Sequence, residues 1–392
     1  MTSQTLVLAD YPVGHGSGFG ETLFNLFDGF PSDKLWTAYP SHMTVAAGKT
    51  RAESIKLAAA TRPQRLPSGA SFAYYPLLKV RQFRAARETV RLLRDAVRNN
   101  SIKNLLVIPV SPWILSAALA LHKQSPKLNL VVYVMDDWQG HHECFKLPYS
   151  TWRKRLLTEV IDRATVRFAV SREMAAHYEE TFGNSWLVVH NGVAGAKLTD
   201  DEPSARNAKD ILLAGDVNVF RFDAVLAFAE AIERHNRRRG DALALTIMGE
   251  VAAEHRPSLS ALRAVKLPGR QSHSECLQAM KAAGLLYLPL AFARQSSRIS
   301  LYSLPTKLPE YLASGKHVLF HAPKDSAVYR VAERYDLTPR LATIKPDALD
   351  EFVASWATVG PRNNESTLKI RRALQEEFDL RPLAARFQAA FA

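Results

Sequence analysis

The sequence contains very little cysteine, which argues against two kinds of covalent or metal cross-link. Only Cys144 and Cys276 occur among the 392 residues, and they lie far apart, with no Cys-x-x-Cys pair and no cluster of cysteine with histidine. Neither a disulfide framework nor a zinc site is indicated by such a pattern. Sparse, unpaired cysteine is typical of a reducing compartment.

Long hydrophobic runs are also missing. The most apolar run, 105–121, is interrupted by Pro109, Ser111 and Pro112 and is shorter than the roughly 20 residues that a membrane span requires. It fits better as a buried strand, a turn with Ser111 as N-cap, and a helix that begins at Pro112. Residues 1–10 lack the charged and apolar regions of a signal peptide, so we expect a cytoplasmic protein.

Acidic residues are outnumbered by basic ones. Lysine and arginine together number 51 against 38 aspartates and glutamates, which gives a formal net charge of +13. Such a balance favours anionic partners: nucleic acid, anionic lipid or phosphorylated small molecules. We expect no nucleic acid, because no recognised binding module is present and the most basic helix lacks interleaved stacking aromatics beyond Phe83.

The sequence is rich in short apolar strands that alternate with helical stretches. The expected strands are 5–9, 104–110, 130–135, 166–170, 186–190, 211–215, 244–249, 264–269, 285–290 and 317–320. This alternation predicts parallel sheets covered by helices on both faces, and the length suits two domains of roughly 200 residues. The expected fold class is therefore α/β, with two Rossmann-like doubly wound domains facing each other across a cleft.

A polar, turn-rich segment divides the chain. It predicts a linker at 195–210 between an N-terminal domain of residues 1–194 and a C-terminal domain of residues 211–364, followed by a helical tail, 365–392, with a break near Pro382. Ligands of open parallel sheets bind beyond the carboxyl ends of the strands. The informative residues should therefore follow strands.

Alternating glycines follow the first expected strand. Gly14, Gly16, Gly18 and Gly20 precede an amphipathic helix, and spaced glycines at such a place let backbone N–H groups approach a phosphate or sugar closely. The spacing is not that of a dinucleotide-binding loop, and no acidic residue ends the next strand, which argues against a nicotinamide cofactor. A flexible turn is the alternative.

Two adjacent carboxylates, Asp136 and Asp137, end the buried strand 130–135. Paired carboxylates at a strand end can position hydroxyl groups or act as a base. Helix capping or a solvated loop is the alternative. The nearby histidines, His141 and His142, are not expected to bind a metal, because one adjacent pair does not provide a ligand geometry.

Gly215 and Arg221 lie between the expected strand 211–215 and a helix. The planar guanidinium of Arg221 at a helix entrance suits a diphosphate, which it can bind through two parallel hydrogen bonds. A solvent-exposed arginine without a ligand fits the sequence equally well.

Lys307 is expected in the first turn of a helix over 305–314, where its charge opposes the helix macrodipole. This cost falls if an anion binds there. Glu310 follows three residues later, so both side chains project from one face. An ordinary surface ion pair is the alternative. Pro309 is awkward inside the helix and would delay its start.

A basic stripe, defined as Arg84, Arg87, Arg91, Arg94 and Arg98, recurs at spacings of three and four residues along 81–98. Beside it runs an expected apolar stripe of Phe83, Ala86, Val90, Leu93 and Val97. Such a helix can lie on an anionic membrane surface. The alternative is a core-packed helix with a solvated basic face.

Taken in order, several segments resemble one family. These are VGHGSGFG, VMDDW, AVSREMAAHYEETFG, WLVVHNGV, LLAGDVN, LTIMGEV, VKLPGRQSHSECLQAMKAAGLLYLPL and LPTKLPEYLASGKHVLF. The chain resembles bacterial nucleotide-sugar glycosyltransferases of the GT-B fold, in particular the retaining family 4, most strongly over 164–193 and 264–320.

The resemblance implies a donor site in the C-terminal domain, after the strand that ends at Gly215, and C-terminal helices that cross back to the N-terminal domain. Glu310 would bind the ribose hydroxyls of a UDP- or GDP-sugar. Lys307 and Arg221 would neutralise its diphosphate near the backbone of Thr306, and Arg270 would frame the base.

The same resemblance implies that the Gly16–Gly18 loop closes over phosphate or acceptor. Asp136 or Asp137 would orient the acceptor, or act as the base if the enzyme inverts. Neither a metal nor a cofactor is expected. One position departs from the family pattern: Tyr302 stands eight residues before Glu310, where members commonly carry a glutamate that contacts the donor sugar.

The leading hypothesis is a metal-independent hexosyltransferase that extends a saccharide or lipid-linked acceptor in bacterial surface or exopolysaccharide synthesis. Its expected location is cytoplasmic, at the inner face of the membrane through the basic stripe. A sugar-nucleotide epimerase on the same fold is an alternative. A non-catalytic nucleotide-sugar-binding protein, with Tyr302 marking lost catalysis, is another.

Overall fold

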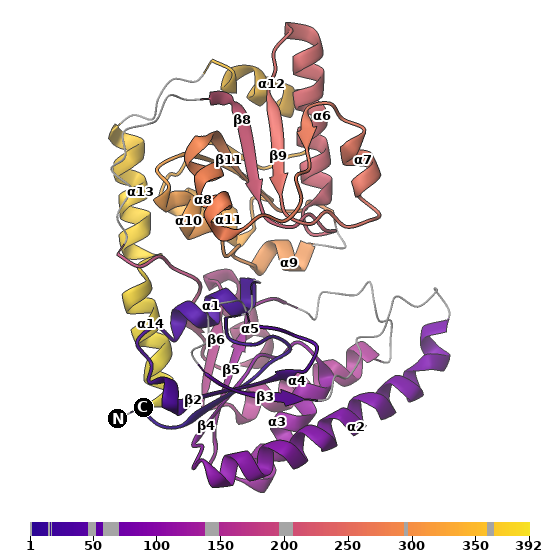
Figure 1. Ribbon diagram of the computed structural model, residues 1–392, viewed down its shortest axis with the longest axis vertical. Coiled ribbons are helices and arrows are strands. Elements are labelled where there is room, and N and C mark those ends of the chain that lie inside the picture. Colours follow the sequence, from indigo (N-terminus) through magenta and orange to yellow (C-terminus); the bar gives the residue numbers. More distant parts are fainter. Residues whose placement is uncertain are drawn as a thin grey trace. The chain divides into compact units, whose positions relative to one another are not determined.

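The computed structural model describes residues 2–14, 16, 18–45, 52–57, 70–137, 149–195, 207–293, 297–358 and 364–392. The chain divides into two compact units (Figure 1). Unit 1 comprises Met1–Asn191 together with Leu380–Ala392, and unit 2 comprises Gly192–Asp379. The division falls a few residues before the expected linker, most of which lies outside the described residues.

Unit 1 is built on a seven-stranded parallel sheet in the order β3-β2-β1-β4-β5-β6-β7. Its strands are β1 Thr5–Leu8, β2 Leu35–Pro40, β3 Glu53–Leu57, β4 Asn104–Val107, β5 Asn129–Val134, β6 Val166–Ala169 and β7 Leu187–Val188. The chain starts at the centre of the sheet, since β1 pairs in register with both β2 and β4. The strand order then runs outward to each edge, as in a doubly wound domain.

The helices of unit 1 are α1 Gly18–Leu26, α2 Ala70–Asn99, α3 Pro112–Gln124, α4 Tyr149–Arg163, α5 Arg172–Phe182 and α14 Leu380–Gln388. Local sequence explains their ends. α3 begins at Pro112 after Ser111, as expected. Ser171 caps α5 by accepting a hydrogen bond from the Met174 amide at 3.0 Å, and Gly183 ends that helix in the left-handed conformation at φ 70°.

Unit 2 is built on a six-stranded parallel sheet in the order β10-β9-β8-β11-β12-β13. Its strands are β8 Asn207–Ala214, β9 Ala244–Met248, β10 Val265–Lys266, β11 Ala283–Pro289, β12 His317–His321 and β13 Arg340–Leu341. The helices are α6 Phe222–Arg239, α7 Arg256–Ser260, α8 His273–Ala282, α9 Ser297–Tyr302, α10 Leu308–Ala313, α11 Ala327–Arg334, α12 Pro346–Trp356 and α13 Asn364–Glu376. The predicted α/β class with two Rossmann-like domains is confirmed.

Both faces of the unit 2 sheet are buried, because alternate residues of each strand point to opposite layers. Ile211 and Leu213 of β8 join a core with Phe228 of α6 and Trp356 of α12. Leu212 joins the opposite core, which includes residues of α8, α10, α11 and α13. α10, which carries Glu310, is thereby fixed against the sheet.

The C-terminal tail divides between the two units instead of forming one body. α13 packs on unit 2, whereas α14 returns to unit 1, as the resemblance implied. Phe387 of α14 stacks edge-on to Phe27 at 5.1 Å between ring centres. The break lies between α13 and α14 rather than at Pro382, because a proline in the first turn of a helix loses no intrahelical hydrogen bond.

Candidate functional site

Charged side chains of unit 2 gather at the carboxyl edge of its parallel sheet. Gly215 follows β8, Gly249 follows β9, and Arg270 lies in the loop after β10. Because the carboxyl ends of parallel strands meet at one edge of the sheet, these loops are neighbours. We call this set of loops, together with α10, the unit 2 edge.

Two glycines allow the loops after β8 and β9 to touch. A Cβ atom on Gly249 would lie 2.3 Å from the Gly215 carbonyl oxygen and 2.8 Å from the Asp216 nitrogen, far inside contact distance. Gly215 has φ 156°, and its own Cβ would lie 2.7 Å from Nη1 of Arg221. Gly215 was expected in the site and Gly249 was not, although a glycine at the end of an expected strand was an available signal.

Asp216 is the common partner of two candidate cations. Its carboxylate accepts a hydrogen bond from the Glu250 amide at 2.8 Å and pairs with Arg270 at 3.0 Å. Its backbone carbonyl accepts a hydrogen bond from Nη1 of Arg221 at 3.1 Å. Arg221 stands at the N-cap position of α6 and is half-buried. The fold therefore brings Arg221 and Arg270 together around Asp216, a residue to which the sequence pattern assigned no role.

The loop that carries Arg270 is held from its other end by the start of α8. Ser272 and Glu275 form a reciprocal capping box, in which the Ser272 amide donates to Glu275 at 2.8 Å and the Glu275 amide donates to Ser272 at 3.3 Å. The Ser272 hydroxyl also donates to the Glu275 carboxylate at 2.5 Å, and this hydrogen bond, followed by that from the Ser272 amide, lowers the pKa of the Glu275 carboxyl. Arg270 itself is exposed, so its guanidinium is available to a ligand that displaces Asp216.

α10 differs from the expected helix over 305–314. It spans only Leu308–Ala313, and Lys307 is its N-cap rather than a residue of its first turn. Pro309 explains the late start, because a proline ring is tolerated only where no intrahelical N–H bond is required. The macrodipole argument for an anion at Lys307 is accordingly weaker in so short a helix.

Lys307 and Glu310 project from one face, as their spacing predicted, and form the ion pair given as the alternative, with 2.8 Å between Nζ and Oε2. Both side chains remain partly accessible, at 32% and 24% exposure. Thr306, just before them, is half-buried, as is Tyr302 at the end of α9. An accessible cation beside an accessible carboxylate is chemically able to hold a phosphate and a sugar hydroxyl together.

Tyr311 fastens α10 to the end of β8. The Ala214 amide donates a hydrogen bond of 2.7 Å to the Tyr311 hydroxyl oxygen, and the side chain is buried. Burial raises the pKa of Tyr311 well above its ordinary value, while the Ala214 hydrogen bond and the charge of Arg221 oppose this rise and the charge of Glu310 adds to it. Arg221 and Glu310 thus both lie within electrostatic range of Tyr311.

The carboxyl edge of the unit 1 sheet, which we call the unit 1 edge, gathers polar groups that are mostly buried. Asp137 is fully buried and accepts a hydrogen bond of 3.0 Å from the Tyr178 hydroxyl, whereas Asp136 is half-buried. Ser111 does not cap α3 with its side chain but donates to Asp10 at 3.0 Å. The two candidate aspartates therefore have different surroundings, and Asp136 is the more accessible.

Only Gly14 and Gly16 precede α1; Gly18 and Gly20, which were expected before the helix, are residues of its first turn. The Gly14 amide donates to the Gly20 carbonyl at 3.1 Å, with Gly14 at φ 82°. Gly16 and Gly18 are exposed, and a Cβ atom on Gly16 would meet nothing within 4 Å. Residues 15 and 17, like the histidines at 141 and 142, lie outside the described residues.

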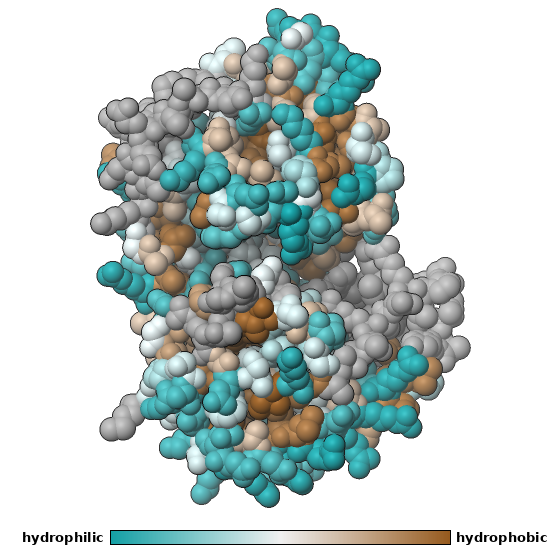
Figure 2. All heavy atoms as spheres, in the orientation of Figure 1, coloured by the Kyte–Doolittle hydropathy of each residue, from teal (hydrophilic) through white to brown (hydrophobic). Residues whose placement is uncertain are grey.

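The basic stripe lies on α2, and all five of its arginines are exposed. Ala86, Val90, Leu93 and Val97 of the apolar stripe are buried within the protein, as in the alternative of a core-packed helix with a solvated basic face. Phe83, the remaining residue of the stripe, is 57% exposed. Around α2, hydrophilic and hydrophobic atoms alternate on the surface of unit 1 (Figure 2).

The described residues contain neither a metal-binding cluster nor a membrane-spanning helix. No group of three or more His, Cys, Asp or Glu side chains there is arranged to hold a metal ion. In the same part of the chain, no helix combines the length and the apolar character that crossing a bilayer demands.

Comparison with known proteins shows similarity in structure and not in sequence. No family model and no curated protein matches the chain. An E. coli trehalose-6-phosphate protein bound with UDP-2-fluoro glucose superposes with a TM-score of 0.68 at 10% identity, over 99% of this chain and 98% of that one.

Two further solved structures cover almost the whole chain. WaaG, a glycosyltransferase involved in lipopolysaccharide biosynthesis, has a TM-score of 0.63 at 12% identity over 99% of both chains. A putative UDP-N-acetylglucosamine 2-epimerase from Listeria monocytogenes has 0.59 at 10% identity, over 99% of this chain and 95% of that one. At such identities the likeness establishes the fold alone, which is that of GT-B glycosyltransferases: two Rossmann-like domains.

Proposed function

We propose that the protein is a nucleotide-sugar glycosyltransferase that transfers a hexose from a nucleoside diphosphate sugar to a saccharide or lipid-linked saccharide. One observation carries the proposal: Arg221, Arg270 and the Lys307–Glu310 pair gather at the unit 2 edge, where ligands of parallel α/β sheets bind. The fold supports this reading, and the order of the sequence motifs supports a family 4-like enzyme.

In the donor complex, the diphosphate lies among the cations Arg221 and Lys307, close to the backbone of Thr306. Glu310 accepts hydrogen bonds from the ribose hydroxyls, which replace part of its present contact with Lys307. Arg270 leaves Asp216 to frame the base. Gly215 leaves room for the Arg221 guanidinium beside the backbone after β8, which holds this cation near the diphosphate.

Transfer breaks the bond between the anomeric carbon and the donor phosphate oxygen, and the bonding electrons leave with the diphosphate. Arg221 and Lys307 stabilise the negative charge that develops on this leaving group, which is the main electrostatic contribution to catalysis. The acceptor hydroxyl attacks from the same face and gives its proton to the departing phosphate oxygen, so the anomeric configuration is retained. The nucleotide sugar is a substrate, and the scheme assigns no step to a metal or cofactor.

The acceptor is assigned to unit 1. Asp136, the accessible member of the pair, orients the acceptor hydroxyl, and the buried Asp137 holds the loop through Tyr178. Gly16 and Gly18, which are both exposed, lie over the phosphate or the acceptor. The exposed basic stripe of α2 binds an anionic membrane surface, which would suit surface or exopolysaccharide synthesis at the inner face of a bacterial membrane.

The proposal is tested by incubating the protein with UDP-, GDP- and dTDP-hexoses and measuring release of the nucleoside diphosphate, with and without saccharide acceptors. Arg221→Ala should lower the turnover about 100-fold or more, because leaving-group stabilisation is lost. Arg330→Ala is the matched control, since Arg330 is an exposed arginine on α11 of the same unit. Equal turnover in Arg221→Ala and in the control would contradict the assignment.

The same assay tests the epimerase alternative, which is considered because one similar structure is a putative epimerase. Epimerisation requires a protein acid and base, yet Asp216 and Glu310, two carboxylates of the unit 2 edge, are each paired with a cation. Isomerised nucleotide sugar without acceptor would support the epimerase. Donor binding with neither transfer, hydrolysis nor isomerisation would support a non-catalytic protein.

A further inference from the structure

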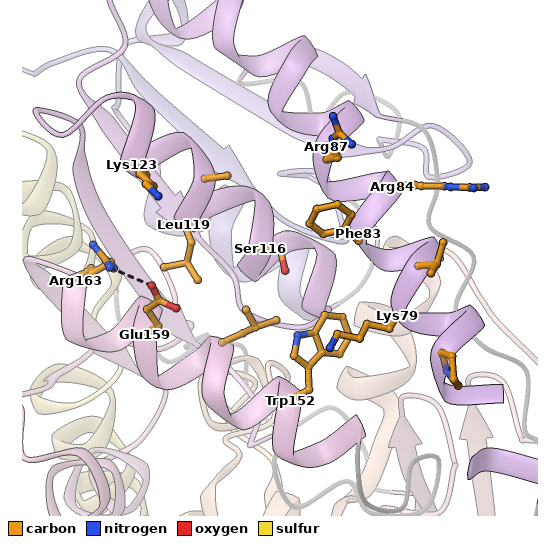
Figure 3. Close-up of a pocket in the computed structure, with 14 residues that line it drawn as sticks. Lys79, Phe83, Arg84, Arg87, Ser116, Leu119, Lys123, Trp152, Glu159 and Arg163 are labelled. Carbon is orange, nitrogen blue, oxygen red and sulfur yellow. Dashed lines mark hydrogen bonds and ion pairs between the residues drawn. The ribbon is translucent and has the colours of Figure 1, made fainter. Parts of the chain in front are cut away.

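A groove on unit 1 is separate from both sheet edges. It lies between α2, α3 and α4 and has a volume of about 880 Å³ (Figure 3). Its apolar lining comprises Val80, Phe83, Leu119, Trp152 and Leu156. Val80 and Phe83, one turn apart on α2, are 46% and 57% exposed. Exposed apolar side chains gathered in a concavity mark a binding site more often than a solvent-facing surface.

The rim of this groove is strongly basic. Among the described lining residues, the charged side chains are Lys79, Arg84, Arg87, Lys123 and Arg163, with Glu159 as the carboxylate. Glu159 is bound to Arg163 at 3.1 Å. The charge balance of the lining therefore favours an anionic occupant.

Two basic side chains of the rim contact aromatic rings that line the groove. The Lys79 ammonium lies 5.9 Å from the ring centre of Trp152, and the Arg87 guanidinium lies 5.9 Å from that of Phe83. In Figure 3, Phe83 points toward α3 while Lys79 reaches across to Trp152. Each of the two rings thus lines the groove and lies close to a cation.

We propose that this groove binds one acyl chain of an anionic phospholipid, whose phosphate binds cations of the basic rim. A flat bilayer surface can touch the exposed arginines of the basic stripe, but it cannot fill a groove. A single chain can, and its phosphate would then meet the cations at the rim. The inference rests on the membrane association proposed above and names its ligand; it does not depend on the donor site.

The test uses lysophosphatidylglycerol below its critical micelle concentration, titrated calorimetrically into the full-length protein. We expect one molecule to bind per chain. Inorganic phosphate, which supplies only the negative charge, and an uncharged alkyl maltoside monomer, which supplies only the hydrocarbon chain, should each bind at least about tenfold more weakly. Failure of the wild-type protein to bind the lysolipid overturns the proposal.

Two substitutions on α2 locate the site. Val80→Glu places a carboxylate in the groove and should weaken lysolipid binding about tenfold or more. Leu92→Glu is the matched control, because Leu92 is also an exposed apolar side chain of α2, at 39%, but does not line the groove. Equal losses in the two variants overturn the proposal. So does a wild-type dimer in sedimentation that Val80→Glu dissociates, because a second copy would then occupy the groove.

Two parallel measurements separate this inference from the proposed function. Binding to phosphatidylglycerol vesicles is measured for the triple variant Arg91→Glu, Arg94→Glu, Arg98→Glu, whose residues do not line the groove. Loss of vesicle binding with intact lysolipid binding supports the groove and shows that the stripe acts separately. Nucleotide titration of Val80→Glu should give the same affinity as wild type. Loss of lysolipid binding alone therefore reports on the groove, and loss of nucleotide binding reports on the donor site.

Discussion

The unit 1 edge and the unit 2 edge are both formed by loops at the carboxyl ends of a parallel sheet, but their polar contacts differ in exposure to water. At the unit 1 edge, polar side chains bind one another in a buried contact between Tyr178 and Asp137 and a partly buried one between Ser111 and Asp10. At the unit 2 edge, Asp216 with Arg270 and Glu310 with Lys307 are ion pairs that water reaches. A buried pair stabilises a loop, whereas an accessible pair can exchange partners with a charged ligand. The difference favours unit 2 as the unit that binds the proposed anionic donor.

The largest expected effect comes from the glycine contact at the unit 2 edge. Gly249→Ala forces a Cβ atom against the Gly215 carbonyl, a backbone group that cannot rotate away. We expect a loss of about 3 kcal/mol in the free energy of unfolding, measured by urea denaturation, together with loss of nucleotide binding. Gly16→Ala, at a position with open space around the added methyl group, should change stability by less than about 0.5 kcal/mol.

Unit 2 contains a fully buried histidine, His321, that makes stability depend on pH. Burial lowers the pKa of His321 to about 4, although the hydrogen bond to the Thr343 carbonyl opposes this shift. The unfolded chain binds a proton near pH 6.5 and the folded chain only near pH 4, so stability falls as the pH is lowered through this window.

The loss should approach roughly 3 kcal/mol between these pH values. The measurement is urea denaturation of wild type and His321→Gln across this window. The variant should lose less stability on acidification than wild type. Parallel pH profiles of the two proteins would show that His321 is not the group responsible.

The two aspartates of unit 1 should respond differently to removal. Asp137→Ala leaves the buried Tyr178 hydroxyl without its acceptor, which should cost about 2 kcal/mol of stability. Asp136→Ala should cost less than about 1 kcal/mol, because the side chain is only half-buried, and should lower sugar transfer at least tenfold. Thermal melting and turnover of both variants provide the test. If Asp136→Ala lowers stability more than Asp137→Ala does, Asp136 does not belong to the acceptor site.

The smallest expected effect is at the exposed pair of unit 2. Asp216→Ala removes an anion that competes with the ligand for Arg270, so affinity for a nucleoside diphosphate should rise about threefold to tenfold. Stability should change by less than about 1 kcal/mol, because both side chains are at least half exposed. A weaker affinity in the calorimeter would mean that Asp216 positions Arg270 for the ligand rather than competing with it.

Local chemistry explains what could be predicted from the sequence. The strands, the start of α3 at Pro112, the cap at Ser171 and the end of α5 at Gly183 all depend on a few neighbouring residues. The Lys307–Glu310 pair likewise follows from a spacing of three. The expected helix over 305–314 is longer than α10, because Pro309 fits only in the first turn of a helix and therefore fixes where α10 begins.

The remaining features depend on contacts between distant segments. Gly249 matters only because another loop crosses it, and Asp137 is buried by Tyr178, which lies 41 residues away. Phe83 fits the helical period of the apolar stripe, but the period does not reveal which part of α2 its neighbours cover. Periodicity predicts a face, whereas burial depends on the tertiary partner.

The most direct test of the donor assignment is calorimetric titration with UDP, GDP and dTDP of wild type, Glu310→Ala and Glu333→Ala. Glu333 is the matched control, because it forms an i,i+3 ion pair with Arg330 on α11 of the same unit. The account predicts that one nucleotide binds wild type and the control equally, and binds Glu310→Ala at least about tenfold more weakly. If no nucleotide binds, or if Glu310→Ala binds like wild type, the Lys307–Glu310 pair is an ordinary surface contact and the donor site is wrongly assigned.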